Sequence, residues 1–192
     1  MNQLQGLIAE PLIEGNGYTW TYASRLGNML ALAEELYGER DHTYTILGVE
    51  FVSGIPQIWY PGHGKNIVIQ LSKACIVNIQ QGCYQLAHEC IHLLAPTGGQ
   101  NANVLEEGLA THFAAFYMAE KMGAPGWRGT VSSYAYAEQL VKQLLAFDSN
   151  AIRNLREVQP VLSKISAELI AEKYPAFPEA DAIQLTEKFR RQ

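Results

Sequence analysis

The period of the hydrophobic positions changes twice along the chain. Between residues 21 and 37 the apolar positions follow the i, i+3, i+4 spacing of a helix with one buried face, and Gly38 follows as a helix-ending glycine. From 43 to 72 the period falls to two, with β-branched and aromatic residues enriched and a Pro-Gly-His-Gly turn at 61–64. This segment predicts a small antiparallel sheet of three strands, near residues 43–51, 57–60 and 66–72.

The helical period returns near residue 80 and continues to the end of the chain. It predicts helices at 80–94, 103–122, 134–147, 149–158, 161–174 and 178–190. Lys188, Arg190 and Arg191 are then expected to form the charged end of the last helix, where cations are favourable. The expected fold class is α+β in a single domain: a small antiparallel or mixed sheet with the site helices over about residues 1–125, then a helical subdomain over about 130–192.

Composition and charge narrow the class of protein. The chain has 192 residues, of which 48% are hydrophobic and 17% charged, and this excludes global disorder. A net charge of −5 argues against nucleic acid and anionic membranes as partners, since both require a basic surface. We see no secretory leader and no apolar run of the roughly 18 residues that span a membrane. Three cysteines without framework spacing, Cys75, Cys83 and Cys90, are typical of a reduced compartment, so we expect a cytoplasmic protein.

One motif carries chemistry. Residues 88–92 read His-Glu-Cys-Ile-His, an H-E-x-x-H pattern inside a predicted helix. His88 and His92 are four residues apart, so both imidazoles lie on one helix face and can bind one tetrahedral metal ion. Glu89 projects beside that metal, where its carboxylate can take a proton from the attacking water. Two imidazoles and a carboxylate suit Zn²⁺, although Mn²⁺, Co²⁺ or Fe²⁺ could use the same ligands.

The next predicted helix offers two glutamates as a third protein ligand. Asn103 followed by Glu106 resembles a capping box, which gives Glu106 a structural role at the helix start. Glu107 has small neighbours, Gly108 and Ala110, which permit the two helices to approach closely. We therefore expect Glu107 to complete the ligand set, with Glu106 as the alternative.

The segment from about residue 65 to 120 resembles the zincin metallopeptidases, specifically the gluzincins, whose third zinc ligand is glutamate. Leu86-Ala87-His88-Glu89 and His92-Leu93-Leu94 are similar to the active-site helix of the short cytosolic peptidases that cleave phage-type repressors. Glu107-Gly108-Leu109-Ala110 looks like the E-G-F-A stretch of the aminopeptidases. Two features depart from these families: the gap of 14 residues between His92 and Glu107 is short, and Thr111 stands where thermolysin-like enzymes carry an acidic residue.

The resemblance implies a zincin-like fold and the hydrolysis of a peptide or protein substrate with one Zn²⁺ per chain. In this reading His88, His92 and Glu107 hold the zinc, and Glu89 is the general base. An oxyanion donor is expected as well, and Tyr134 and Tyr136 are the candidates for it. The strand at 66–72 would be either an edge strand that pairs with an extended substrate or an ordinary strand of the sheet.

The other histidines have simpler interpretations. His63 lies in the predicted turn and His42 in a surface turn beside Asp41. His112 follows Glu107 by five residues, about 140° around the helix, and is expected to face away from the metal.

Two alternatives to a peptidase use the same residues. One is a catalytically inactive protein on a zincin scaffold that binds a peptide or a regulatory partner, and Glu89 argues against it because a binding protein has no need of a general base. The other is hydrolysis of a non-peptide amide, which the sequence does not distinguish from peptide hydrolysis.

Overall fold

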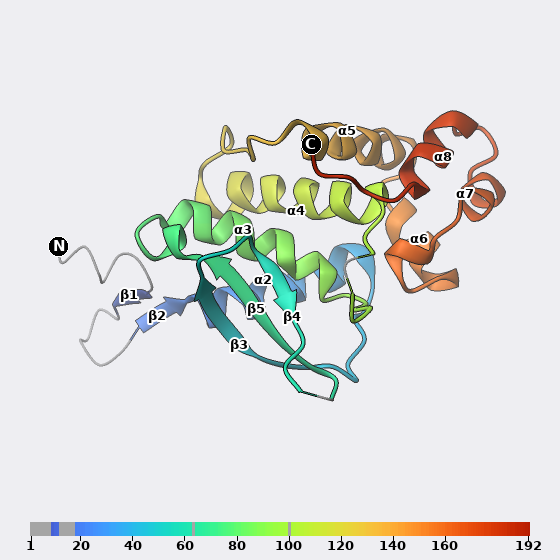
Figure 1. Ribbon diagram of the computed structural model, residues 1–192. Coiled ribbons are helices and arrows are strands. Elements are labelled where there is room, and N and C mark those ends of the chain that lie inside the picture. The colour runs from blue at the N-terminus through green and yellow to red at the C-terminus, as the bar shows by residue number, and fades with distance from the viewer. Residues whose placement is uncertain (1–8, 12–17, 63, 100) are drawn as a thin grey trace.

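The computed structural model describes residues 9–11, 18–62, 64–99 and 101–192, with side chains described from residue 21 onward. Figure 1 shows an α+β arrangement in which α2 and α3 cover one face of a small sheet, and α4 and α5 are stacked beyond α3. The strands are β1 (Ala9–Pro11), β2 (Tyr18–Thr21), β3 (Thr45–Val52), β4 (Gln57–Trp59) and β5 (Asn66–Ser72). The helices are α2 (Tyr22–Tyr37), α3 (Ile79–His92), α4 (Val104–Met122), α5 (Ser132–Phe147), α6 (Ala151–Val158), α7 (Ala167–Lys173) and α8 (Glu179–Thr186), with 3₁₀ turns η1 (Lys73–Ile76) and η2 (Leu162–Lys164).

The main sheet is mixed, with strand order β3-β5-β4. β4 and β5 pair antiparallel, whereas β3 and β5 pair parallel, so of the two expected alternatives, an antiparallel or a mixed sheet, the structure has the mixed one. β5 lies in the centre because its alternate side chains, Ile67, Ile69 and Leu71, are fully buried against the helices. Of the two alternatives for residues 66–72, the edge strand is therefore wrong, and β3 and β4 form the edges of the sheet.

The opposite face of the sheet is polar at its centre. Gln57 of β4 donates to Gln70 of β5 at 2.7 Å, and Gln70 donates to Glu50 of β3 at 2.6 Å. This row of side chains crosses all three strands. It satisfies polar groups on the face that the helices leave uncovered.

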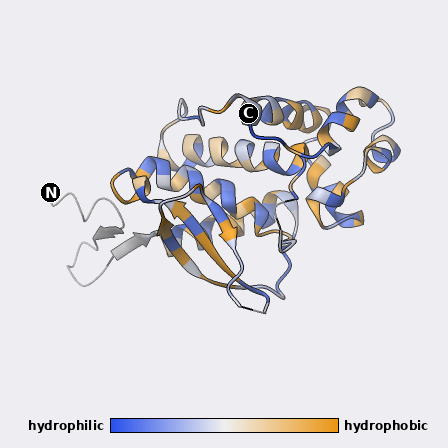
Figure 2. Ribbon diagram, viewed as in Figure 1, coloured by the Kyte–Doolittle hydropathy of each residue, from blue (hydrophilic) through white to orange (hydrophobic). Residues whose placement is uncertain are grey.

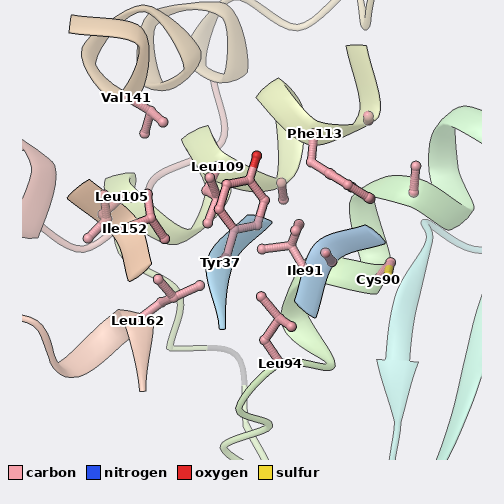
Figure 3. Packing of buried hydrophobic residues seen from close by; sticks show 14 of the residues in the cluster. Tyr37, Cys90, Ile91, Leu94, Leu105, Leu109, Phe113, Val141, Ile152 and Leu162 are labelled. Atoms are coloured by element: carbon pink, nitrogen blue, oxygen red, sulfur yellow. The ribbon is translucent and has the colours of Figure 1, made fainter. Parts of the chain in front are cut away.

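The core lies between α2, α3 and α4, where residues far apart in the sequence interlock. Figure 3 shows Tyr37 of α2, Ile91 of α3 and Phe113 of α4 converging, and the Tyr37 and Phe113 rings meet edge-on with centroids 6.1 Å apart. In Figure 2 the strands that face this core are predominantly hydrophobic. All three cysteines fall in the described part of the chain, where they are buried and form no disulfide.

Arg156 of α6 links the C-terminal region, from α6 onward, to this core. Its buried guanidinium donates to carbonyls at the end of α2, among them Tyr37 at 2.6 Å, and to that of Leu94 after α3 at 3.4 Å. The last carbonyls of a helix have no partner within it, so a cation that donates several hydrogen bonds satisfies them well.

The C-terminal region departs from its prediction. The helix expected at 161–174 is split into η2 and α7, and the helix expected at 178–190 ends at Thr186. Lys188, Arg190 and Arg191 are thus not the end of a helix. The backbone after α8 extends instead and pairs with the start of α4, since Val104 N–H donates to the Glu187 carbonyl at 3.0 Å. Among the described residues, no helix is long and apolar enough to cross a bilayer.

The approach of α4 to α5 gives a prediction about two helix glycines. A Cβ at Gly108 would lie 2.3 Å from the backbone oxygen of Ala137, whereas a Cβ at Gly27 in α2 would meet nothing within 4 Å. We predict that Gly108→Ala lowers the free energy of unfolding by about 1–3 kcal/mol through overpacking. Gly27→Ala, the control, raises it by up to about 1 kcal/mol. Denaturant unfolding of both variants checks this, and an unchanged stability of Gly108→Ala would contradict the close packing.

Candidate metal centre

Helix α3 positions the two histidines of the H-E-x-x-H motif. Asn78 caps the helix by accepting from the Gln81 N–H at 3.0 Å. The apolar residues of the helix are buried in the core, which holds His88 and His92 on the side that faces α4. The two imidazole centroids are 5.4 Å apart, as expected for residues one turn apart on one face.

The first turn of α4 supplies the carboxylates. Asn103 caps this helix, accepting from the Glu106 N–H at 2.9 Å, and Glu106 and Glu107 follow directly. The positive end of the helix dipole favours carboxylates in this turn. Because α3 and α4 pack side by side, the turn lies against His88 and His92.

His88, His92 and Glu107 form a cluster whose ligand atoms all lie within 4.8 Å of one another. His88 Nε2 is 3.0 Å from Glu107 Oε2, and His92 Nε2 is 3.8 Å from Glu107 Oε1. Ligands at the zinc distances typical of proteins sit roughly 3.3 Å from one another around a tetrahedral ion. The three side chains could therefore hold a metal ion with small adjustments, and it is Glu107 rather than Glu106 that belongs to this cluster.

Glu106 has a different role from the one its capping-box spacing predicts. Asn103 caps α4 as expected, but the Glu106 side chain contacts His92 Nδ1 at 2.8 Å instead of reaching back along the helix. This contact leaves Nε2 of His92 directed toward Glu107. Carboxylates that hold the second nitrogen of a metal-binding histidine fix its tautomer and orientation, so Glu106 is suited to position His92.

The charges in the cluster depend on one another. Burial opposes a charge on His92, but the carboxylates of Glu107 and Glu106 outweigh it and raise the pKa of the imidazole to about 10. Burial would raise the pKa of Glu107, yet His92, His88 and Arg191 together lower it. Positive charge, from protons or from a metal ion, is thus needed to balance the buried carboxylate of Glu106 and the largely covered one of Glu107.

Glu89 is buried beside the cluster, with 5% of its surface exposed. Burial raises the pKa of its carboxyl, an effect that His92 and His88 partly offset. The remaining exposed edge of Glu89 contributes to the cleft described next. A carboxylate in this position can reach a molecule bound next to the histidines.

A cleft made of two adjoining cavities opens onto the cluster. Their volumes are about 430 Å³ and 680 Å³. Six residues line both of them: Ile55, Pro56, His88, Glu89, Tyr134 and Arg191. The smaller cavity extends toward the aromatic side chains of Tyr84 and Trp127, and the larger one extends along β4. A chain-like ligand could therefore pass across the histidines from one cavity into the other.

The structure separates the two tyrosines proposed as oxyanion donors. Tyr134 lines both cavities, and its ring meets His88 edge-on with centroids 5.4 Å apart. Burial, aided by Glu107, raises its pKa to about 12, so its hydroxyl is a hydrogen-bond donor at neutral pH. Tyr136 lies two residues further along α5, about 200° around the helix, and points elsewhere. It is 51% exposed and donates to Gln184 of α8, so its assignment to the site is corrected.

The remaining predicted residues lie outside the cluster. His112 lines a separate cavity on the other side of α4, as expected, and the 61%-exposed side chain of His42 is on the surface near Glu34. His63 lies outside the described residues. Gly108 faces α5 rather than α3, so its small size serves a different helix contact from the one expected.

Sequence reasoning named Glu106 only as a cap or as the alternative ligand, and it missed Arg191 as a contributor to the site. The spacing of Glu106 from Asn103 matches the capping motif, whereas its contact with His92 depends on how α3 packs on α4, which the sequence does not show. Arg191 was expected at a helix end, and no periodic signal in the sequence brings it to the cleft.

Comparisons with protein-family models, with curated protein sequences and with solved structures find no match. The function of this site is therefore argued from its own residues.

The geometry predicts a graded loss of metal. Elemental analysis of protein purified without chelator or affinity-tag metal is expected to find about one zinc per chain, and Glu107→Ala is expected to lose it. Glu106→Gln should retain zinc with an affinity roughly 10–100-fold weaker, because a neutral amide oxygen holds the His92 imidazole less strongly than the carboxylate does. Glu157→Gln, a substitution of an exposed glutamate in α6, is the control and should bind zinc normally. Full zinc content in Glu107→Ala would contradict the ligand assignment.

Proposed function

We propose that this protein is a zinc-dependent peptidase. The observation that carries the proposal is the convergence of His88, His92 and Glu107 beside a buried Glu89, at the meeting point of two cavities. Three protein ligands with a cleft alongside are the pattern of catalytic rather than structural zinc sites, which use four protein ligands.

The donor set fits zinc. His88, His92 and Glu107 would hold the ion, and Glu106 would keep His92 in the orientation that leaves Nε2 available. When bound, zinc supplies Lewis acidity, which makes a water molecule a better nucleophile near neutral pH and polarises the carbonyl of the substrate.

Glu89 is suited to move the proton. It is the one carboxylate of the H-E-x-x-H segment, and no ion pair with another described residue occupies it. In the proposed reaction Glu89 takes a proton from the attacking water and then passes it to the amine that leaves. Its burial keeps bulk water from competing for that proton.

Tyr134 is suited to stabilise the transition state. Its ring packs on His88, and its side chain lines both cavities. Negative charge develops on the carbonyl oxygen during attack, and a hydroxyl that is already positioned there stabilises it.

The edge strand β4 supports a peptide as the substrate. Within the described part of the chain β4 pairs only with β5, which leaves its second edge without a strand. Residues Gln57–Trp59 also line the larger cavity. An extended peptide could add to this edge through backbone hydrogen bonds, which recognise the main chain independently of side-chain identity.

The decisive experiment replaces the proposed base. We predict that Glu89→Gln keeps about one zinc per chain but loses hydrolysis of a fluorescence-quenched peptide library by roughly 10²–10⁴-fold. The matched control Glu157→Gln should retain wild-type rates. Hydrolysis at the wild-type rate by Glu89→Gln would overturn the mechanism. A zinc-loaded wild-type protein that binds library peptides without cleaving them would instead establish a binding protein on this scaffold.

The two tyrosines provide a second test. Tyr134→Phe is expected to lower kcat by about 10²–10³-fold, the loss seen when one oxyanion donor is removed. Tyr136→Phe should change kcat less than about twofold, because that hydroxyl bonds to Gln184 outside the cleft. Steady-state kinetics on one quenched peptide measure both, and equal effects of the two substitutions would contradict the assignment.

A further inference from the structure

The extended segment after α8, residues 187–192, forms one wall of the cleft. Figure 1 shows it crossing the start of α4 and ending beside the start of α5, and in Figure 2 it is strongly hydrophilic. Phe189 N–H donates to the Ala102 carbonyl at 3.1 Å, and Gln192 N–H donates to Ser133 Oγ at 3.2 Å. The backbone is thus held on both sides of Arg190 and Arg191.

Phe189 connects this segment to the site. Its ring packs on Tyr134 with centroids 4.8 Å apart, and Tyr134 in turn packs on His88. The segment is therefore built against the catalytic side of the cleft. The arrangement gives Arg191 a defined starting point from which its long side chain reaches the cavities.

Arg191 is the only lysine or arginine of the described residues that lines both cavities. Arg128 lines the smaller one alone, and its guanidinium already donates to the carbonyls of Pro125 and Trp127. Of the two cavities of the cleft, Lys188 lines the larger one alone. The guanidinium of Arg191 forms no hydrogen bond or ion pair with any described residue, yet its charge influences both Glu107 and Tyr134.

We propose that Arg191 determines specificity by binding a carboxylate of the substrate next to the scissile bond. This inference rests on the proposed peptidase function and names its substrate class: peptides with a carboxylate adjacent to the bond that is cut. A guanidinium binds a carboxylate through two parallel hydrogen bonds, a geometry that lysine does not offer.

Two sources supply such a carboxylate in a peptide: the free C-terminus and the side chain of aspartate or glutamate. Both sources present the same planar, charged group to Arg191. The two cavities extend from the histidines in different directions, so the cleft has room for either source. The carboxylates of Glu89, Glu106 and Glu107 would otherwise disfavour an anionic substrate, so a free cation at this position discriminates strongly.

The test measures binding separately from hydrolysis. Zinc-loaded Glu89→Gln protein, which should not turn the peptides over, is titrated calorimetrically with three probes: N-acetyl-Ala-Phe-Ala with a free C-terminus, its C-terminal amide, and the amide of N-acetyl-Ala-Phe-Asp. At least one carboxylate-bearing probe is expected to bind about tenfold or more tightly than the neutral amide. Preference for the first identifies the C-terminus as the source, and preference for the third identifies the acidic side chain.

Matched variants in the same Glu89→Gln background assign the preference to Arg191. Arg191→Gln is expected to reduce it to less than about threefold, and Arg191→Lys to restore part of it. Arg190→Gln is the control, since Arg190 is the adjacent arginine and lines neither cavity of the cleft. Circular dichroism verifies that each variant is folded, and substitution of an exposed arginine should change stability little.

Three results would overturn the proposal: equal binding of charged and neutral probes, a preference that survives Arg191→Gln, or no measurable binding of any probe at millimolar concentration. A fourth is kinetic. If Arg191→Gln in the otherwise wild-type protein lowers kcat equally for acid and amide substrates, Arg191 acts on the reaction rather than on specificity. Absence of hydrolysis by the wild-type protein would refute the peptidase function alone, because the binding preference is measured independently.

Discussion

The structure depends on two adjacent carboxylates in the first turn of α4, those of Glu106, which is buried, and of Glu107, which is largely covered. Removing two negative charges from water is costly unless each meets a partner. The partners are the imidazoles of His88 and His92 on α3. His88 Nε2 lies 3.0 Å from Glu107 Oε2 and His92 Nδ1 lies 2.8 Å from Glu106 Oε1, and these contacts fix how α3 lies against α4. This pairing divides the roles of the glutamates: Glu107 faces both histidines, whereas Glu106 holds the far side of one.

The start of α4 consequently organises much of the surrounding molecule. Asn103 caps the helix and also donates to the Leu162 carbonyl in η2, while the backbone on either side pairs with the segment after α8. The two site helices, η2 and the segment after α8 thus meet around one helix turn. The cleft lies where they meet, so its walls come from segments that are distant in sequence: β4, α3, α5 and the residues after Thr186.

Local patterns predicted most of the site and the helices that carry it. The i, i+4 spacing of His88 and His92 and the apolar periods of α2, α3 and α4 are properties of short segments, and those helix bounds agree with the structure within a few residues. The errors concern pairings between distant segments. The parallel register of β3 on β5 and the end of α8 at Thr186 depend on non-local backbone bonds, which no local period encodes. Arg191 was missed for the same reason.

X-ray absorption at the zinc K edge, on protein loaded with one equivalent of zinc, tests the metal centre most directly. If His88, His92 and Glu107 hold the zinc, its first shell contains nitrogen and oxygen at about 2.0–2.2 Å and no sulfur, with the outer-shell scattering of two imidazoles. A sulfur shell at about 2.3 Å would place the metal on cysteine and contradict the account. Failure of the protein to retain zinc at all would contradict it equally.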